Sequence, residues 1–498
     1  MSDGTCPPQE ITTILIDGAA YTGGPGTVTL YECSDVDATY DLMNIRLVNF
    51  PEGLWFEWAY HNDSIDLIIK SLANYKDYSQ SYRDSYPYEE YPEQVHTDHF
   101  PDHSFDTVPT WTRFSKKLHL PGKINRGKPD NFNAGPWSEE DIDLIAKKHY
   151  LSWYGLNSAD HITEIWDRIK DADPTHKTMY YWNAETLWGT TDQGTGALPD
   201  YFRSDVVGTN DRPLFDHSNP EMRDWWVNFG LTMANHPSSN GVFTDNTISR
   251  ECDRKKSDWE NGNAAACDLE ITDKSVMVRD LAQAVPDDRL DIGNYLRNMV
   301  DGGNRFRMKD ADGTYFENTH FSPDTGNKLE PIIVSMQLAR EASWKKKLVM
   351  WTGSRRNCRC PFNNIVPKCN QQFCTAIGQT CCVPQMCQGF VQTNGVEPTA
   401  LLENDFEIAL AEFLMVVEKW SYGYFAVAPD WTCEKWRADW SHMELFNKPL
   451  GKPLGPPLKS GYTFSRHFEH LSVKIKLKWN GYEESAAGVG GDVEFIFH

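Results

Sequence analysis

A regular alternation of short strand-like runs with amphipathic helical runs constrains the fold most, and it starts near Val108. Such a series of strand–helix units is typical of a (β/α)8 barrel, an α/β fold. A doubly wound open sheet alternates in the same way, but the chain lacks the glycine-rich turn that binds dinucleotides. The segment between the fifth and sixth strands, 298–312, has little helical pattern. The eight expected strands are 110–116, 150–156, 177–185, 240–246, 289–297, 313–321, 347–353 and 422–430.

The residues on either side of this alternation predict smaller β structures. Short β-type runs separated by Gly, Pro and Asp predict an N-terminal β module, followed by a Tyr-rich linker. Such a module either packs on the barrel or binds sugars. A final alternating run at 471–481 predicts a C-terminal β extension, with Lys474, Lys476 and Lys478 on its wet face. The expected division is 1–105 for the N-terminal module and linker, 106–440 for the barrel and 441–498 for the extension.

Seven of the 12 cysteines lie between Cys358 and Cys387, in an expected insertion after the seventh strand, 354–400. An even total with one dense cluster predicts disulfides and an oxidising compartment, so we expect an extracellular or secretory location. Zinc binding is the alternative, although the spacing of Cys358 and Cys360 does not match a zinc knuckle. The first residues carry no signal-peptide pattern. One glycosylation triplet starts at Asn62.

The formal net charge of −23 argues against a nucleic-acid partner, because phosphate binding needs a basic face. It also argues against strongly acidic polysaccharides. The chain has no apolar run of about 18 residues, so we expect no membrane span. Its histidines show no metal-ligand spacing, and we expect neither a metal nor a cofactor.

In such barrels the catalytic groups lie at the carboxyl ends of the strands. Those ends supply acids, amides and aromatic residues here, and almost no Lys, Arg or Cys. Aromatic rings offer flat apolar faces that suit sugar rings. Most of the aromatic residues are expected in the core, with Trp153 and Trp351 as candidates for the cleft. The candidate substrate-binding residues are Trp153, Tyr154, Tyr181, Asn183, Glu185, Asn246, Asn294, Asn318, Trp351 and Asp430.

The fourth and sixth strands end in matching motifs, GVFTDN at 241–246 and GTYFEN at 313–318. Each motif places an acid and then Asn at the strand end, so Asp245 and Glu317 should reach the same mouth. A single acid there would suit a turn or a helix cap, but a matched pair suits glycoside cleavage. One acid protonates the leaving oxygen, and the other attacks as nucleophile or activates water. Glu185 competes with Glu317 as proton donor.

A helix-then-strand passage carries a family resemblance. SNPEMRDWWVNF before GVFTDN resembles the N-P-x-x-R-x-W-W helix and G-V-F-x-D strand shared by several glycoside hydrolase barrels. Together with GTYFEN and the tail LGKPLGPP…SGYTFSRHFEH, it resembles the hypothetical glycosyl hydrolase families of the GHL series, particularly the fifteenth. The resemblance implies catalytic acids at Asp245 and Glu317, the strand positions that the alpha-galactosidase clan also uses. The N-terminal module and the cysteine-rich insertion depart from that series.

We therefore expect a glycoside hydrolase that acts on a neutral or weakly charged poly- or oligosaccharide. Asp245 would be the nucleophile or base, and Glu317 the general acid. Two other functions stay open at this point. One is a non-catalytic carbohydrate-binding or surface-assembly protein on the same barrel, and the other is a polysaccharide lyase with a Tyr or His base. The direction and separation of the two carboxyls distinguish the first two functions.

Overall fold

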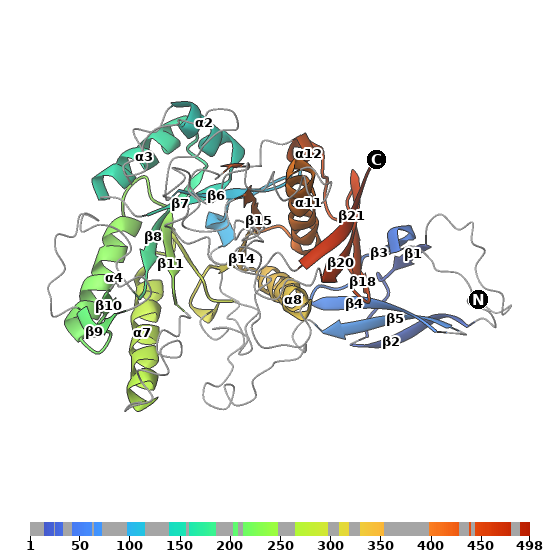
Figure 1. The fold of residues 1–498 in the computed structure, drawn as a ribbon, viewed down its shortest axis with the longest axis horizontal. Helices are drawn as coiled ribbons and strands as arrows, with labels where there is room; N and C mark the ends of the chain where they lie inside the picture. Colours follow the sequence, from blue (N-terminus) through green and yellow to red (C-terminus); the bar gives the residue numbers. More distant parts are fainter. Residues whose placement is uncertain are drawn as a thin grey trace, which may run out of the picture.

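The centre of the protein is an eight-stranded, all-parallel sheet surrounded by helices (Figure 1). The structure is a computed structural model. It describes residues 14–23, 25–32, 42–61, 64–71, 97–114, 139–155, 159–185, 203–207, 213–247, 264–296, 308–317, 329–352, 398–427, 438–439, 444–479 and 489–498.

The strands of the central sheet follow one another in chain order, and the sheet nearly closes into a barrel. Between the last strand and the first, the backbone N–H of Gly423 donates to Pro109 O over 3.0 Å, beside a parallel bridge to Thr110. The predicted barrel and all of its strands are thus confirmed, and the open-sheet alternative is wrong. The strands are β6 (Trp111–Phe114), β7 (Leu151–Tyr154), β8 (Lys177–Asn183), β11 (Gly241–Asp245), β12 (Leu290–Gly293), β13 (Gly313–Phe316), β14 (Leu348–Thr352) and β15 (Ser421–Tyr424).

Helices cover the outside of the barrel (Figure 1), and α3 is a clearly amphipathic one. In α3 the buried residues Ile162, Ile165, Trp166 and Ile169 recur at helical spacing and so form one apolar stripe. No described residue between β12 and β13 belongs to an α-helix, which agrees with the weak helical pattern of that segment. The helices are α2 (Glu139–Lys148), α3 (Ala159–Ala172), α4 (Pro220–Ala234), α7 (Ala264–Ala284), α8 (Glu330–Trp344), α11 (Pro398–Val416) and the short α12 (Glu444–Asn447).

Aromatic rings fill the inside of the barrel. Trp153 stacks on Phe243 with the ring centroids 5.1 Å apart, and on Tyr181 with the centroids 4.8 Å apart. Tyr315 meets Phe243 edge-on, at a centroid distance of 5.2 Å. Because these rings come from four strands, they form a packed layer beneath the carboxyl ends of the strands.

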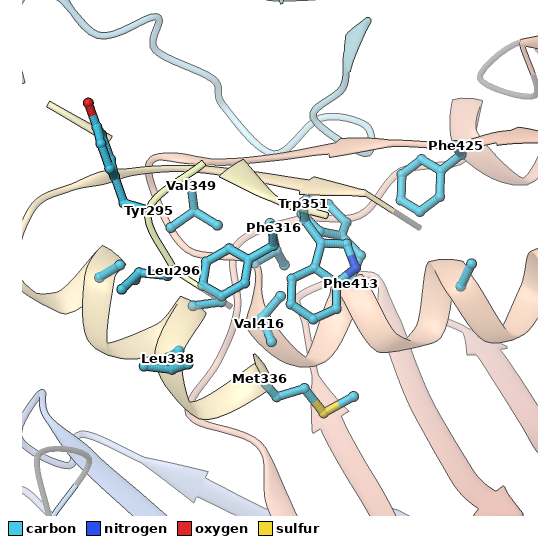
Figure 2. Close-up of a cluster of buried hydrophobic side chains, with 14 of the residues drawn as sticks. Tyr295, Leu296, Phe316, Met336, Leu338, Val349, Trp351, Phe413, Val416 and Phe425 are labelled. Carbon is cyan, nitrogen blue, oxygen red and sulfur yellow. The ribbon is translucent and has the colours of Figure 1, made fainter. Parts of the chain in front are cut away.

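A second core lies between the barrel and its helices. Figure 2 shows Phe316 of β13 and Trp351 of β14 packed with Phe413 and Val416 of α11 and with Met336 of α8. Trp351 is completely buried there. Successive side chains of each strand therefore point alternately into the core inside the barrel and into the core between the barrel and its helices.

Strands of the predicted N-terminal β module and of the predicted C-terminal β extension form one seven-stranded sheet beside α8 and α11 (Figure 1). The two halves meet where β4 pairs in parallel with β18, with Phe56 opposite Leu458. Of the three lysines predicted to face solvent on β20, Lys476 and Lys478 are exposed and Lys474 is half-buried. In order across the sheet, the strands are β2 (Gly26–Glu32), β5 (Ser64–Ser71), β4 (Leu54–Tyr60), β18 (Leu458–Ser460), β19 (Thr463–His467), β20 (Leu471–Trp479) and β21 (Val489–Phe497).

The remaining elements are small. Strands β1 (Ile14–Asp17) and β3 (Ile45–Val48) form a parallel pair that packs on β4 and β5. Two antiparallel pairs are β9 (Arg203–Val207) with β10 (Pro213–Phe215), and β16 (Ala426–Val427) with β17 (Ala438–Asp439). Two 3-10 turns are η1 (Leu42–Asn44) and η3 (Thr97–His99). None of the described helices has the length and apolar character needed to cross a membrane.

The predicted cysteine cluster, Cys358–Cys387, lies outside the described residues. The disulfides, and the location inferred from them, therefore stay predictions.

Candidate functional site

The two candidate acids lie at the same end of the barrel. Asp245 is the last residue of β11, and Glu317 directly follows β13. Asp245 is 8 % exposed, whereas Glu317 is half-buried. Parallel strands end at one edge of the sheet, which brings both carboxyls to the face where barrel active sites form.

Asn294, just beyond β12, connects the two acids. Its Nδ2 atom lies 3.1 Å from Asp245 Oδ1 and 3.4 Å from Glu317 Oε2, so one amide group donates to both carboxyls. The Asn294 backbone is itself fixed, because its N–H donates to Thr244 O and its carbonyl accepts from Thr247 Oγ1. The side chain is completely buried. The two carboxyls therefore point toward one common donor and not away from each other.

Asp245 accepts two further hydrogen bonds. The Tyr181 hydroxyl donates to Oδ2 over 2.7 Å, and the Asn246 N–H donates to Oδ1 over 2.8 Å. Asn246 has a positive φ of 55°, a left-handed conformation that asparagine tolerates better than most residues. The strand end GVFTDN is thus a tight turn that also concentrates donors on Asp245. This donor set suits the ionised carboxylate, which only accepts hydrogen bonds.

Tyr181 and Asn183, on β8, continue this network. Asn183 Nδ2 lies 3.2 Å from the Tyr181 hydroxyl oxygen, and Asn183 Oδ1 accepts from the backbone N–H of Glu185 over 2.9 Å. Burial, and then the neighbouring Asp245, raise the pKa of Tyr181 well above its usual value. Tyr181 therefore keeps its proton and acts as a donor.

The N-P-x-x-R-x-W-W motif explains how the end of β8 is held. Asn219 caps α4 by accepting from the Glu221 N–H, and Pro220 occupies the first turn, where its missing N–H costs nothing. Trp226, nearly two turns further along, donates its indole N–H to Asn183 O over 2.9 Å. The motif thus connects the start of a helix to the backbone of a residue that contacts Tyr181.

Glu185 forms a buried ion pair with Lys274 of α7. The distance from Lys274 Nζ to Glu185 Oε1 is 3.6 Å, and both side chains are at most 5 % exposed. A carboxylate paired with a buried ammonium favours its charged form, which does not support Glu185 as the proton donor. Sequence reasoning missed Lys274, because a lysine within a helical pattern normally predicts a solvated surface.

The predicted aromatic platforms are placed in the cores. Trp153 is 2 % exposed inside the barrel, and Tyr154 and Trp351 are buried in the helix-facing core. Their placement does not support contact with a sugar, because a stacking platform needs an open face. Asn318 and Asp430 lie outside the described residues. The site therefore consists of Tyr181, Asn183, Asp245, Asn246, Asn294 and Glu317.

Among the residues that the structure describes, no group of His, Cys, Asp or Glu could hold a metal ion. The amide and hydroxyl donors of the site hold the two carboxyls in place.

A separate buried acid, Asp291 of β12, lies on the helix-facing side of the barrel. Its Oδ2 accepts from the Tyr295 hydroxyl over 3.3 Å, and Oδ1 has no partner among the described residues. Burial, and then Asp312, raise the pKa of Asp291 well above its usual value. The folded protein therefore binds this proton more tightly than the unfolded chain does.

We expect Asp291→Asn to flatten part of the pH dependence of stability. With a raised folded pKa, this group favours folding most below the unfolded value of about 3.9, and the benefit is lost as pH rises. The variant should gain stability over the parent as the pH rises above about 4, as measured by urea unfolding. Asp288→Asn, at an exposed ion pair, is the control and should change stability by less than about 0.5 kcal/mol. A variant that follows the parent's pH slope would contradict the expectation.

Comparison with known proteins identifies the family. The chain matches hypothetical glycosyl hydrolase family 15 over residues 170–472, which is more than half of its length. It therefore belongs to that family, as its helix-and-strand motifs predicted. A search of curated proteins gave no match.

Solved structures similar to the chain include glycoside hydrolases. The glycoside hydrolase domain of PelA from Pseudomonas aeruginosa is 8 % identical with a TM-score of 0.30, covering 49 % of this chain and 83 % of that one. Aspergillus fumigatus Ega3, in complex with galactosamine, is 14 % identical with a TM-score of 0.29, and the match covers 50 % of this chain and 78 % of that one. An Anoxybacillus alpha-amylase is 8 % identical with a TM-score of 0.41, and the match covers 80 % of this chain and 99 % of that one. The assignment rests on the family match and the strand order, not on these low scores.

Proposed function

We propose that the protein is a glycoside hydrolase in which Asp245 is the nucleophile and Glu317 is the general acid and base. The observation that carries the proposal is the Asn294 amide, which donates to both carboxyls at the barrel mouth. Family membership supports a carbohydrate-active role in general, and the bridged acids support a specific mechanism. The acidic chain favours a neutral or weakly charged glycan.

The two acids differ in a way that suits these two roles. Asp245 is nearly buried and accepts three hydrogen bonds, so its carboxyl is held in one orientation. Glu317 is half-buried and so is more open to the leaving oxygen and to water. In the first step, Glu317 protonates the leaving oxygen while Asp245 forms an ester with the anomeric carbon. In the second step, Glu317 takes a proton from water, the water oxygen bonds to that carbon, and Asp245 leaves as a carboxylate.

The separation of the acids supports retention of configuration. Since Asn294 contacts both, Asp245 Oδ1 and Glu317 Oε2 lie at most about 6.5 Å apart, the sum of the two contacts. Retaining enzymes hold their carboxyls about 5–5.5 Å apart, and inverting ones about 6.5–9.5 Å.

The proposal is tested by incubating the full chain with a panel of neutral aryl glycosides and polysaccharides and following the first product by NMR. We expect hydrolysis of at least one glycan, and a first product with the anomeric configuration of its substrate. Inversion would exclude Asp245 as a nucleophile. Binding without any cleavage across the panel would favour the non-catalytic carbohydrate-binding function instead.

A further inference from the structure

A chain of hydrogen bonds leads to Asp245 from the loop that follows β8. It starts at the Glu185 N–H, which donates to Asn183 Oδ1 over 2.9 Å. It continues through Asn183 Nδ2 to the Tyr181 hydroxyl, over 3.2 Å, and from that hydroxyl to Asp245 Oδ2, over 2.7 Å. Asn183 and Tyr181 are each 3 % exposed, so bulk water does not compete for these groups.

This chain of hydrogen bonds runs in a single direction, because its first member can only donate and its last member can only accept. A backbone N–H only donates, so the oxygen of the Asn183 amide faces Glu185 and its NH2 group faces Tyr181. The Tyr181 oxygen accepts from that NH2 group, which leaves its single proton for Asp245. The carboxylate of Asp245 only accepts, and the chain ends there.

We propose that Asn183 and Tyr181 are positioning residues, in which the Asn183 amide fixes the direction of the Tyr181 hydroxyl so that its proton is always given to Asp245. The inference rests on the proposed function, in which Asp245 attacks the sugar and later leaves as a carboxylate. The donor holds that carboxylate in one orientation and stabilises its negative charge.

The loop that starts the chain is held on both sides. Glu185 pairs with Lys274 through its side chain, and its carbonyl accepts from the Phe215 N–H over 2.9 Å. On the other side, the Ala184 N–H donates to Asp245 O over 2.9 Å, which ties the end of β8 to the end of β11. The donor of Asn183 therefore lies in a fixed place relative to Asp245.

The first test is Tyr181→Phe, which removes the hydroxyl and keeps the ring. We expect kcat to fall on the order of 100-fold. The acidic limb of the pH–rate profile should also move to higher pH, because a donor to the charged carboxylate is lost. Tyr180→Phe is the matched control, because Tyr180 is the preceding residue on β8 and packs in the helix-facing core. It should keep the parent's rate and profile.

The second test reverses the direction of the hydrogen bond between residue 183 and the Tyr181 hydroxyl. Asn183→Asp keeps the acceptor for the Glu185 N–H but replaces the NH2 donor with an oxygen that accepts the Tyr181 proton. We expect it to lower kcat at least as much as Tyr181→Phe and to move the acidic limb in the same direction. The proposal would be overturned if both variants kept the pH–rate profile of the parent protein. A residue with a purely structural role would change stability without shifting the acidic limb of that profile.

A third measurement separates this inference from the proposed function. In urea unfolding, Tyr181→Phe should lower the midpoint more in the parent chain than in an Asp245→Asn background, because only in the parent does the hydroxyl lose a charged acceptor. This cycle needs no substrate, so it decides the hydrogen-bond chain even if the protein cleaves no glycoside. Equal shifts in both backgrounds would overturn the proposal.

Discussion

Replacing Asp245 with asparagine should lower the rate of glycoside hydrolysis by at least about a thousandfold, which corresponds to about 4 kcal/mol of lost transition-state stabilisation. The amide cannot attack the anomeric carbon, and its NH2 group faces donors where the carboxylate accepted hydrogen bonds. Replacing Glu317 with glutamine should cost about 10²–10⁴-fold, the range for removal of a general acid. Rates on the best substrate of the panel measure both effects.

The leaving group distinguishes the two roles. A substrate with an acidic phenol as its leaving group needs little protonation, so it should restore the first step in Glu317→Gln and leave Asp245→Asn inactive. Asp291→Asn is the matched control, because it changes a buried strand aspartate on the helix-facing side and should keep the parental rate. Circular dichroism confirms that each variant is folded. Substantial activity in folded Asp245→Asn would exclude the assignment of Asp245.

The second large effect concerns stability. Arg466 of β19 is 1 % exposed, and its guanidinium donates to three carbonyls near the end of α11: Leu414 O at 3.2 Å, Met415 O at 3.3 Å and Val417 O at 2.8 Å. It also contacts Glu418 Oε1, at 2.7 Å. The last carbonyls of a helix have no partner within the helix, so Arg466 satisfies groups that would otherwise be buried unpaired.

We expect Arg466→Met to lower the free energy of unfolding by about 3–5 kcal/mol, because a buried acceptor set and part of an ion pair lose their partner together. Arg466→Lys should recover only part of the loss, since an ammonium cannot reproduce the fork of a guanidinium. Urea unfolding measures both.

A surface arginine provides the comparison for Arg466. Arg279 is 47 % exposed and pairs with the adjacent, equally exposed Asp280, so Arg279→Ala should cost less than about 1 kcal/mol. If Arg466→Met were no more costly than Arg279→Ala, the helix-end contacts would not stabilise the fold as described.

The strand–helix alternation predicted the barrel because it depends on local pattern alone. Each barrel strand is short and largely apolar, and helices such as α3 have one apolar face, and both features are periodic in the sequence. The same reasoning placed Asp245 and Glu317 at one mouth, because it needed only the ends of the strands. Whether the two acids catalyse hydrolysis stays a prediction.

Contacts between distant residues could not be predicted in this way. The sequence identified Asn294 as a strand-end amide, but only the closure of the barrel brings its NH2 group to both acids. Trp351 follows the same strand-end pattern as Tyr181, yet the alternation of side chains directs it to the helix-facing core. The ion pair between Glu185 and Lys274 could not be predicted for a similar reason, because only the fold brings the helix that carries Lys274 close to Glu185.

The parallel pairing of β4 with β18 affects the order in which the seven-stranded sheet can form during protein synthesis. Lys459 reaches Glu57 over 3.3 Å across a sequence separation of 402 residues, so the ribosome must deliver the whole barrel before this pairing can form. Until then the hairpin of β4 and β5 presents an unpaired strand edge that is open to other chains. Strands β2, β4 and β5 precede the barrel in the chain, yet their sheet is completed only after the barrel has been synthesised.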